Sequence, residues 1–422
     1  MGSLRRHLRH GRVHRAALDH GADRTATIPV LATQVGIVGA GPAGLMLAHL
    51  LRLQGISSVV LESRSRDYIE HRVRAGVLEQ GSVDLLERTG AGERMRREGL
   101  VHHGIQLRFA GGDHRIDFGT LTGGRGITVY GQQELVKDLI RLRLEAGEQI
   151  HFEVSNVRLD RIDGERPRIT FAHDGDEMTL DCDVIAGCDG FHGVSRATIP
   201  AGVLTAYERE YPFAWLGILA TVAPSSEELI YCFHDRGFAL LSMRSPTVSR
   251  LYLQVPADER IDDWSDTRIW AELQTRFALP GWTLRDGPIT EKGISALRSY
   301  VVEPMQYGRL YLAGDAAHIV PPTGAKGMNL ALRDVSVLAD ALTAFYRSGD
   351  TTVLDGYSTQ CLRRVWRAQH FSWWMTSMLH RFPDSDAYQT QLQLAQLAYT
   401  VNSRAAATSL AENYVGYEWG LS

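Results

Sequence analysis

The segment Gly39-Ala40-Gly41-Pro42-Ala43-Gly44 constrains the fold of this chain more than any other stretch of its sequence. An apolar run at residues 34–39 predicts a buried strand before it, residues 42–53 predict a helix after it, and residues 58–62 predict the next strand. This order is typical of a βαβ unit of about 30 residues, whose two strands lie parallel in one sheet. We therefore predict an α/β fold that contains a Rossmann-like domain.

Each glycine of this segment has a separate task in a dinucleotide-binding turn. Gly39 permits the tight turn, Gly41 lets the backbone approach a pyrophosphate, and Gly44 lets the helix pack closely on the strand. Ala43 lies in the first turn of the helix, whose free N–H groups and positive dipole end attract phosphate. Glu62 ends the second strand, where an acid can bind ribose hydroxyls. The pattern predicts a dinucleotide without separating FAD from NAD, and a purely structural glycine turn is the alternative.

The composition argues against several classes of protein. The chain has 422 residues, and its 44% hydrophobic and 22% charged residues are typical of a soluble globular protein. The net charge of −4 gives no reason to expect nucleic acid or an anionic membrane as a partner. No stretch offers about 18 unbroken apolar residues, so we expect no membrane span. Cys182, Cys188, Cys232 and Cys361 form no CxxC pair, which favours reduced thiols in a cytoplasmic protein over disulfides or a zinc site, and we expect no metal.

Changes of pattern along the chain divide it into four regions. Residues 1–32 are rich in Arg and His and poor in large apolar residues, so we expect a disordered tail there. Residues 33–205 hold the dinucleotide-binding domain. Residues 206–300 contain short segments rich in β-branched and aromatic residues, which predict a second domain built on a mixed β-sheet. Residues 301–422 return to the nucleotide site and then become mainly helical. Further helices are predicted at 79–98, 132–147 and 355–380.

Two further motifs decide which nucleotide is bound. The pair Asp189-Gly190 follows an apolar strand, and the pair Gly314-Asp315 ends another. GxGxxG, then DG, then GD, in this order, resembles the FAD-dependent aromatic hydroxylases, which are single-component flavoprotein monooxygenases. The resemblance implies FAD as cofactor, with Asp315 on its ribityl or ribose part and Asp189 near the flavin and the nicotinamide. A plain turn or helix cap is the alternative role for Asp315.

The helix expected to start near Lys326 would point its N-terminus at the flavin ring. A positive dipole end there stabilises the anion of reduced flavin by about 0.3–2 kcal/mol. The resemblance implies further FAD contacts, of which the last two act through backbone N–H groups: Arg72, Arg74, Gln132, Met328 and Asn329. Arg74 and Gln132 could instead be ordinary polar surface residues.

Longer stretches resemble one branch of that family, from residue 33 to residue 420. They are RVRAGVLEQG at 72–81, GLVHHG at 99–104, CDGFHGVSR at 188–196, PPTGAKGMNLA at 321–331 and AENYVG at 411–416. The resemblance implies that 4-hydroxybenzoate is hydroxylated to 3,4-dihydroxybenzoate in aromatic catabolism. NADPH would reduce FAD, oxygen would form a C4a-hydroperoxyflavin, and the bound phenolate would attack its distal oxygen. A flavin that swings between an exposed and a buried position is also implied.

The two ends of such a substrate make opposite demands on the pocket. A carboxylate needs a cation with fork geometry and hydroxyl donors. Arg244 and Ser242 fit, because a strand places them on one face, and Tyr252 would add a third donor. By resemblance these three residues bind the carboxylate. A surface arginine is the alternative reading of Arg244.

The phenol end must lose a proton, because a phenolate is the stronger nucleophile. A phenol in water has a pKa near ~10, and hydrogen-bond donors that favour the anion lower it. Tyr231 and Tyr414 match the tyrosine relay of the family, which passes the proton to His102. We expect His102 to have a pKa near the ordinary ~6.5, suited to a relay end at neutral pH. Without the resemblance, His102 would be taken for a structural loop histidine.

Other residues are expected to shape and dry the pocket. By resemblance, Pro322 and Thr323 form its wall between substrate and flavin. Water must be kept out, since it would decompose the oxygenated flavin. Apolar walls are expected from Val77, Trp215, Leu229 and Leu240. Each of these could instead be ordinary core, which burial statistics favour for Trp215.

The reductant is expected to bind without a second GxGxxG domain. Residues that match NADPH positions of the family are Arg64, Tyr68, Arg72, His192 and Arg298. The cations suit a 2′-phosphate, so we expect NADPH, with NADH as a possible second reductant. Trp373, Trp374 and Met375 in the C-terminal region are interpreted as core packing, while the resemblance implies a homodimer in which they form an interface.

Two alternative functions stay open at this point. One is a related flavin hydroxylase that acts on another phenol, such as 3-hydroxybenzoate. The other is a flavin-binding sensor that kept the fold and lost catalysis. The combination of Arg244 with Tyr231 and Tyr414 favours a para acid over the first, and the presence of every relay and carboxylate residue argues against the second.

Overall fold

The computed structural model describes residues 30–72, 74 and 76–416. Its first element, β1 (Val30–Ala32), pairs in parallel with β12 (Asp176–Asp181). The expectation that the tail extends to residue 32 is therefore wrong for the last three of its residues, because a strand partner far along the chain captures them. The rest of the predicted tail lies outside the described residues.

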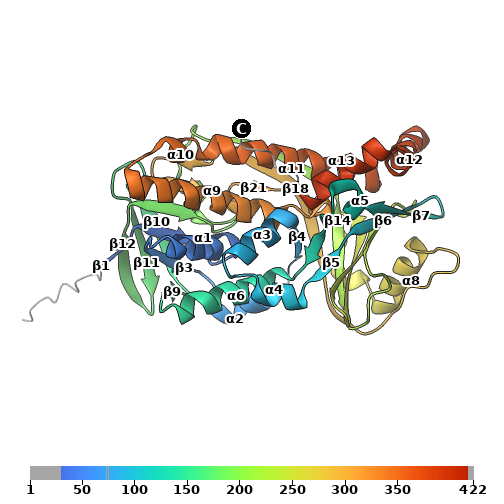
Figure 1. Ribbon diagram of the computed structural model, residues 1–422. Coiled ribbons are helices and arrows are strands. Elements are labelled where there is room, and N and C mark those ends of the chain that lie inside the picture. The colour runs from blue at the N-terminus through green and yellow to red at the C-terminus, as the bar shows by residue number, and fades with distance from the viewer. Residues whose placement is uncertain (1–29, 73, 75, 417–422) are drawn as a thin grey trace, which may run out of the picture.

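A six-stranded sheet carries the nucleotide-binding motifs (Figure 1). Its order is β19 (Gln306–Tyr307), β20 (Leu310–Leu312), β13 (Val184–Gly187), β2 (Val35–Val38), β3 (Ser58–Leu61) and β9 (Ile150–His151). Strands β20, β13, β2 and β3 are parallel. The GxGxxG, DG and GD motifs follow β2, β13 and β20, so all three meet at the carboxyl edge of neighbouring strands.

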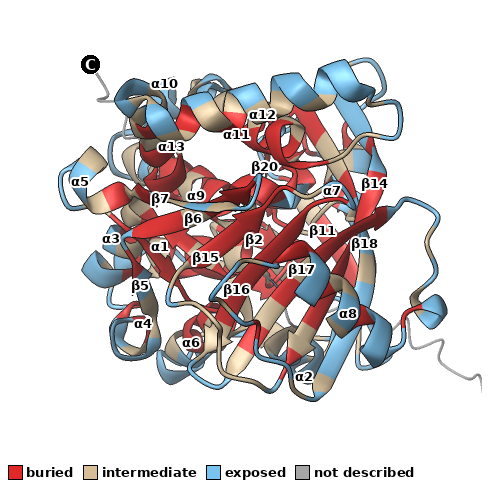
Figure 2. Cartoon of the chain, turned by 90° about the vertical axis from the view of Figure 1, so that its right-hand side faces the viewer, coloured by how far each residue is buried: buried red, intermediate tan, exposed pale blue. Residues whose placement is uncertain are grey.

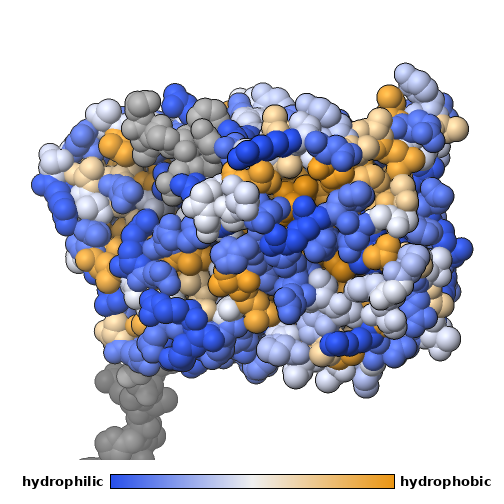
Figure 3. All heavy atoms as spheres, turned by 45° about the vertical axis from the view of Figure 1, so that its right-hand side comes forward, coloured by the Kyte–Doolittle hydropathy of each residue, from blue (hydrophilic) through white to orange (hydrophobic). Residues whose placement is uncertain are grey.

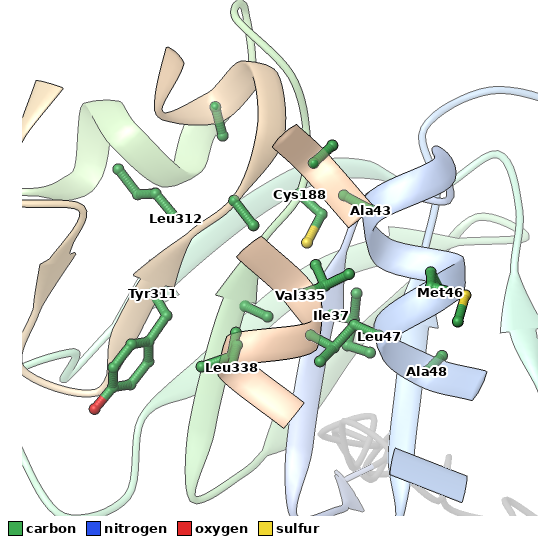
Figure 4. Packing of buried hydrophobic residues seen from close by; sticks show 14 of the residues in the cluster. Ile37, Ala43, Met46, Leu47, Ala48, Cys188, Tyr311, Leu312, Val335 and Leu338 are labelled. Atoms are coloured by element: carbon green, nitrogen blue, oxygen red, sulfur yellow. The ribbon is translucent and has the colours of Figure 1, made fainter. Parts of the chain in front are cut away.

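Two helices from opposite ends of the chain pack together on this sheet. They are α1 (Pro42–Leu53) and α9 (Gly327–Ser348), and Figure 4 shows their apolar side chains meeting over β2 and β20. Ile37, Leu47 and Leu338 are fully buried there. The predicted helix at 42–53 is confirmed, and the helix expected near Lys326 has that residue as its N-cap.

The second sheet is mixed, as expected. It has eight strands and draws on more of the chain than residues 206–300. Its order is β21 (His318–Ile319), β18 (Ile289–Glu303), β14 (Thr205–Ala220), β17 (Val248–Pro256), β16 (Ala239–Ser245), β15 (Leu229–Cys232), β6 (Gly104–Phe109) and β7 (Gly112–Asp117). Strand β6 pairs in parallel with β15. The predicted boundary at 205 therefore fails for β6 and β7, because this pairing spans more than a hundred residues and leaves no local signal.

Helices cover the two faces of the second sheet differently. One face packs on α8 (Asp266–Arg276). The other packs on α11 (Tyr357–Leu379), α12 (Ala387–Asn402) and α13 (Arg404–Val415). Figure 2 shows that the central strands of the sheet are buried. The face toward α11 and α13 gathers the residues predicted to bind the substrate.

The remaining elements are helices, turns and the strands of two smaller sheets, one of order β1-β12-β11-β10 and one of order β4-β8-β5. They are α2 (Arg66–His71), β4 (Val77–Glu79), α3 (Gln80–Arg88), α4 (Glu93–Glu98), β5 (Leu100–His102), α5 (Phe118–Thr122), β8 (Ile127–Val129), α6 (Gln132–Glu145), β10 (Ser155–Asp160), β11 (Arg168–His173), α7 (Val194–Thr198), α10 (Thr352–Asp355) and the short 3-10 turns Ile261–Asp263, Gly314–Ala316 and Pro322–Gly324. The helix predicted at 79–98 is split, because Gly90 takes a left-handed φ of 77°. Within the described ranges, no helix combines the length and the apolar character that crossing a membrane requires.

Candidate active site

The three glycines of the first motif have different surroundings. Gly39 has a φ of 105°, and a Cβ added there would lie 2.3 Å from the carbonyl oxygen of Cys188. A Cβ on Gly44 would lie 1.9 Å from the carbonyl oxygen of Gly39. A Cβ on Gly41 would meet no atom within 4 Å. Two glycines are thus required by the turn itself, whereas Gly41 leaves the open space that a pyrophosphate needs.

The start of α1 is an open site for an anion. Its N-cap is Gly41, which has no side chain to accept from the first N–H groups of the helix, and Pro42 follows. Glu62 directly follows β3 nearby, and its Oε2 accepts a hydrogen bond of 2.8 Å from the backbone N–H of Ala40. Its Oε1 accepts one of 2.8 Å from the N–H of Arg64. These bonds fix the carboxylate and leave lone pairs for ribose hydroxyls.

Asp315 of the GD motif lies in the 3-10 turn that follows β20. Its side chain is exposed, yet surrounding protein raises its pKa by desolvation, against the opposing charges of His318 and Arg74. Both observations fit a carboxylate that water reaches only through an indentation. The loop is held by Asp334, whose Oδ2 accepts from the N–H of Gly314 at 3.0 Å and from His318 Nε2 at 2.6 Å.

Asp189 of the DG motif has one occupied and one unoccupied oxygen. Its Oδ2 accepts hydrogen bonds from the backbone N–H of Ser195 at 2.9 Å and from its Oγ at 3.0 Å. Its Oδ1 is buried without a partner, and burial raises the pKa of the carboxyl group. A buried acceptor without a donor is rare, and a ligand hydroxyl or N–H would satisfy it. With the space above Gly41, this atom indicates that the edge of the sheet fits a bound dinucleotide.

The start of α9 contains a buried ion pair that the sequence did not reveal. Lys326 Nζ lies 2.6 Å from Glu79 Oε1 and also donates to the carbonyl oxygen of Tyr414 at 3.1 Å. Burial lowers the pKa of Lys326, while Glu79 opposes this change. The Asn329 side chain donates to Val77 O and accepts from Glu79 N, both at 2.9 Å. The side chain is thus occupied, which agrees with the expectation that Asn329 acts through its backbone.

One face of the second sheet brings together the residues predicted for the carboxylate. Ser242 projects from β16 on the same face as Leu240, and Arg244 follows at an irregularity in the pairing of β16 with β17. The Arg244 Nη2 donates to the carbonyl oxygen of Arg74, whereas its Nε is buried without a partner. Burial lowers the pKa of Arg244 to about 10. A half-buried guanidinium whose buried Nε lacks a partner is a strong site for an anion.

Tyr252 projects beside this arginine from β17. Its hydroxyl oxygen accepts from Arg250 Nε at 3.2 Å, so its own proton remains available for a ligand. Its ring lies 4.9 Å from the ring of Trp215. Gly217 of β14 pairs with Tyr252, and a Cβ added to this glycine would lie 3.4 Å from the tyrosine ring. The glycine therefore leaves the ring its place on the sheet.

The predicted tyrosine pair does meet in the interior. Tyr231 in β15 and Tyr414 in α13 join their hydroxyl groups by a hydrogen bond, and both rings are buried. The Tyr231 hydroxyl can also donate to the carbonyl oxygen of Thr323 at 3.2 Å. Burial raises the pKa of both phenols. Neither tyrosine therefore ionises readily at neutral pH, which suits hydroxyls that pass a proton on.

His102 differs from its expectation. It is buried in β5, its Nδ1 has no partner, and burial lowers its pKa to about 4. The expected pKa near its ordinary value is wrong for this arrangement, because the sequence did not reveal the burial. Among the described residues, no hydrogen bond links His102 with Tyr414.

The expected pocket wall is half exposed and half buried. Pro322 is exposed, while its neighbours Pro321 and Thr323 are buried. The hydroxyl of Thr323 lies 2.9 Å from that of Thr376. The apolar residues expected as walls belong to one cluster with Tyr231 or pack against it: Val77, Trp215, Leu229 and Leu240.

Comparison with known proteins decides the family. Residues 32–372 match the family described as an FAD binding domain. The chain is 49% identical over 390 residues to p-hydroxybenzoate hydroxylase of Acinetobacter baylyi, with 92% of this chain and 96% of that protein covered. The chain belongs to the FAD-dependent aromatic hydroxylases of this type. It is thus a flavoprotein monooxygenase with FAD as cofactor.

More distant relatives of this aromatic hydroxylase share its fold. Rifampicin monooxygenase of Rhodococcus hoagii is 27% identical over 323 residues, which cover 74% of this chain and 64% of the relative. The structure of p-nitrophenol 4-monooxygenase from Pseudomonas putida has a TM-score of 0.78 at 20% identity and covers 93% of this chain and 100% of that one. OxyS anhydrotetracycline hydroxylase from Streptomyces rimosus has a TM-score of 0.71 at 21% identity, with 91% and 76% covered.

The residues predicted for the reductant fall into two groups in this hydroxylase. Tyr68 is exposed between Arg64 and Arg72, whose guanidinium carbons lie 5.4 Å and 5.8 Å from its ring. In the other group, Arg298 stacks 4.8 Å from Phe191, next to exposed His192. Arg298 also forms ion pairs of 3.1 Å and 3.4 Å with two glutamates. In the part of the chain that the structure describes, no hydrogen bond, ion pair or ring contact joins the groups.

Two of the other FAD candidates lie at the starts of helices in this hydroxylase, and two lie close to Asp315. Gln132 is the first residue of α6, and Met328 is half-buried in the first turn of α9. Arg72 and Arg74 are exposed, and both are close enough to Asp315 to oppose the rise of its pKa. The sequence did not predict the ion pair between Lys326 and Glu79, whose members are 247 positions apart in the chain. Only the unusual cost of burying a lysine, visible in the structure, singles them out.

Proposed function

We propose that this hydroxylase converts 4-hydroxybenzoate into 3,4-dihydroxybenzoate with NADPH and oxygen. The observation that carries the proposal is the arrangement of polar groups on one apolar sheet face. Leu240 of β16 lies in register with Tyr231 of β15 on one side and Tyr252 of β17 on the other. Two strand spacings, about 10 Å, therefore separate the two tyrosines. A benzoate with a para hydroxyl has the polar ends that such a pair would bind.

At the carboxylate end, we assign the fork of Arg244, the hydroxyl of Ser242 and the hydroxyl of Tyr252. The partnerless Nε of Arg244 and the free proton of Tyr252 support this role. Buried hydrogen bonds to a charged group each contribute about 1.5–3 kcal/mol. These bonds anchor the carboxylate and so orient the substrate ring, with its phenol end toward Tyr231 and Tyr414.

At the phenol end, we assign Tyr231 and Tyr414 to proton transfer. The substrate hydroxyl gives its proton to the Tyr231 oxygen while Tyr231 gives its own proton to Tyr414. Neither tyrosine has to become an anion, which agrees with the raised pKa of both. His102 is proposed as the acceptor of the proton that Tyr414 releases, through its buried Nδ1, which has no other partner among the described residues. The loss of the proton activates the ring carbon beside the phenol oxygen.

FAD supplies the oxygen-activating chemistry when it is bound, and this chain supplies position and protection from water. The residues proposed to hold FAD are Gly39, Gly41, Ala43, Gly44, Glu62, Arg72, Arg74, Gln132, Asp189, Asp315, Met328 and Asn329. Pro322 and Thr323 are proposed to separate the substrate from the flavin. The residues proposed for NADPH are Arg64, Tyr68, Arg72, His192 and Arg298.

A homodimer is part of the proposal. Tyr388, Leu392 and Tyr399 are exposed along α12, at spacings that place them on one side of the helix. Figure 3 shows hydrophobic patches on a largely hydrophilic surface. Near α12, Met375 of α11 is fully buried, whereas Trp373 is 39% exposed. Core packing thus suits the methionine, and an interface suits the tryptophan.

A cytoplasmic location is also proposed. The four cysteines are free and buried, and burial raises the pKa of each thiol. Thiols of this kind are typical of proteins from a reducing compartment.

The direct test is aerobic NADPH consumption by the holoenzyme, with and without 4-hydroxybenzoate, followed by chromatography of the product. We expect strong stimulation and a matching yield of 3,4-dihydroxybenzoate. Stimulation that yields only hydrogen peroxide would contradict the proposal and indicate another phenol as substrate. Turnover with 3-hydroxybenzoate in its place would favour the related-hydroxylase alternative.

A further inference from the structure

His380 lies at the centre of a buried aromatic cluster behind the proposed pocket. It follows directly after α11 and is fully buried. Its ring stacks on Phe238 at 4.3 Å and on Phe213 at 4.8 Å between centroids. A fully buried imidazole is costly unless its nitrogens have partners.

The partners of His380 fix its tautomer. Its Nδ1 lies 3.0 Å from the carbonyl oxygen of Thr376, which can only accept, so Nδ1 carries the proton. Its Nε2 lies 2.7 Å from the indole Nε1 of Trp215, which can only donate. Both hydrogen bonds therefore require the same neutral form, and burial lowers the pKa of His380 to about 3. The imidazole stays neutral at working pH and keeps both bonds.

The hydrogen bond that His380 accepts determines the orientation of the Trp215 indole ring. Trp215 projects from β14 with its indole ring 4.9 Å from the ring of Tyr252. The turn that carries His380 is also tied to β17, since Gln254 accepts from the backbone N–H of Arg381 at 3.0 Å. Gln254 is two residues after Tyr252 on the same face of that strand. Strand β17 therefore positions both the end of α11 and Tyr252.

We propose that His380 is a positioning residue for substrate binding. By accepting the indole N–H of Trp215, it holds that ring against Tyr252 and so fixes the Tyr252 hydroxyl at the carboxylate end of the pocket. The inference rests on the proposed function, because it takes Tyr252 as a ligand of the substrate carboxylate. His380 itself touches none of the residues proposed to contact the carboxylate, and it acts through the indole.

The test compares His380→Phe, which keeps a stacking ring but no acceptor, with His380→Gln, whose side-chain carbonyl can accept the same bond. The Kd of 4-hydroxybenzoate for each FAD-loaded variant is measured from the change of flavin absorbance. We expect about a 10-fold rise in Kd for His380→Phe and a value within about 3-fold of the wild type for His380→Gln. The KM should rise with Kd, while kcat changes less.

A matched control is His49→Phe. His49 is also buried, and its Nε2 lies 2.8 Å from the carbonyl oxygen of Thr89, but it belongs to α1 beside the other sheet. We expect its Kd for 4-hydroxybenzoate to equal that of the wild type. A double-mutant cycle with Tyr252→Phe separates positioning from general loss of structure. If His380 acts through Tyr252, His380→Phe adds no further loss once that hydroxyl is gone.

Several outcomes would overturn the inference. They are an unchanged Kd in FAD-loaded His380→Phe, no rescue by His380→Gln, or full additivity with Tyr252→Phe. If His380→Phe fails to fold, Trp215→Phe removes the donor of the same bond and must itself raise Kd, while Trp270→Phe, which loses a 3.2 Å bond to Gly287 O, must not.

Failure of the inference can be told apart from failure of the proposed function. If the wild-type flavin spectrum does not respond to 4-hydroxybenzoate, the proposed substrate is wrong and the inference falls with it. If the wild type responds and His380→Phe binds equally well, only the role of His380 is wrong.

Discussion

The hydroxyl groups of Tyr231 and Tyr414 share a buried hydrogen bond although 183 positions separate them in the chain. One comes from a strand of the second sheet and the other from the last helix that the structure describes. Residues so far apart meet only when the C-terminal helices close over the sheet. Closure of the fold therefore also assembles the proposed proton path.

Replacement of Tyr231 by Phe should separate binding from chemistry. We expect the Kd of 4-hydroxybenzoate to change by less than about 3-fold, while hydroxylation falls by about 10²-fold or more, because the phenol loses its proton acceptor. Rapid measurement of product per NADPH consumed would check this. Tyr346→Phe is the control, since its hydroxyl donates to Gln34 O at the far end of α9. Unchanged product formation in Tyr231→Phe would show that the relay assignment is wrong.

Replacement of Arg244 by Lys should weaken substrate binding despite the retained charge. A lysine cannot provide the two-pronged geometry, and loss of such a bond costs about 1.5–3 kcal/mol, or about 10- to 150-fold in Kd. Titration of the flavin absorbance measures it. The same change at Arg168, whose Nε lies 2.6 Å from Asp181 Oδ1 in another sheet, should leave Kd unchanged. Equal Kd values for Arg244→Lys and the wild type would contradict the carboxylate site.

Alanine at the first or third glycine of the motif should destabilise the apoprotein, whereas alanine at the second should weaken FAD binding. Gly44→Ala forces a Cβ to within 1.9 Å of Gly39 O, so we expect the apoprotein to lose about 1–3 kcal/mol of unfolding free energy. Gly41→Ala meets no protein atom, so the apoprotein should keep its stability while FAD binds at least about 10-fold more weakly. Thermal melts of apoprotein and FAD titrations give both quantities. Normal FAD affinity in Gly41→Ala would place the pyrophosphate elsewhere.

His102 should make stability depend on pH in a defined direction. Its pKa falls from 6.5 to about 4 on folding, so below pH 6.5 the unfolded chain binds a proton that the folded chain does not. The neutral, buried His102 therefore makes the free energy of unfolding fall by about 3 kcal/mol as the pH drops from 6.5 toward 4, while above pH 6.5 this loss is absent. His102→Gln should lose that part of the pH dependence in urea melts at pH 7 and pH 4. His103→Gln, an exposed neighbour, is the control, and equal slopes for both variants would contradict the burial of His102.

A charge on the exposed side of α12 should disrupt the proposed homodimer. Leu392 is 53% exposed, and Leu392→Asp would place a carboxylate where an apolar partner surface is expected. We expect sedimentation equilibrium to show dimers for the wild type and monomers for this variant. Gln391→Asp adds the same charge one residue away on a polar side chain and should stay dimeric. A wild type that is monomeric at micromolar concentration would refute the proposed assembly.

The sequence by itself determined the local parts of the FAD site. The turn at Gly39, the helix that begins at Pro42 and the helix capped by Lys326 all occur as predicted. Their signals come from residues a few positions apart, since glycine conformations and helix periodicity act over that range. The resemblance of short motifs then supplied candidates for the pocket, and the sheet register places Tyr231, Ser242 and Tyr252 on a common face.

The strand placement, the buried ion pair and the altered pKa depend on residues far apart in the chain, and only the tertiary structure decided them. It placed β6 in the second sheet, buried Lys326 against Glu79, lowered the pKa of His102, and paired His380 with Trp215. Desolvation and long-range hydrogen bonds depend on what the whole chain excludes from water, and residues 165 positions apart leave no common pattern in the sequence. Local propensity thus determines the elements, whereas burial among distant elements determines the charges and the proton positions of the site.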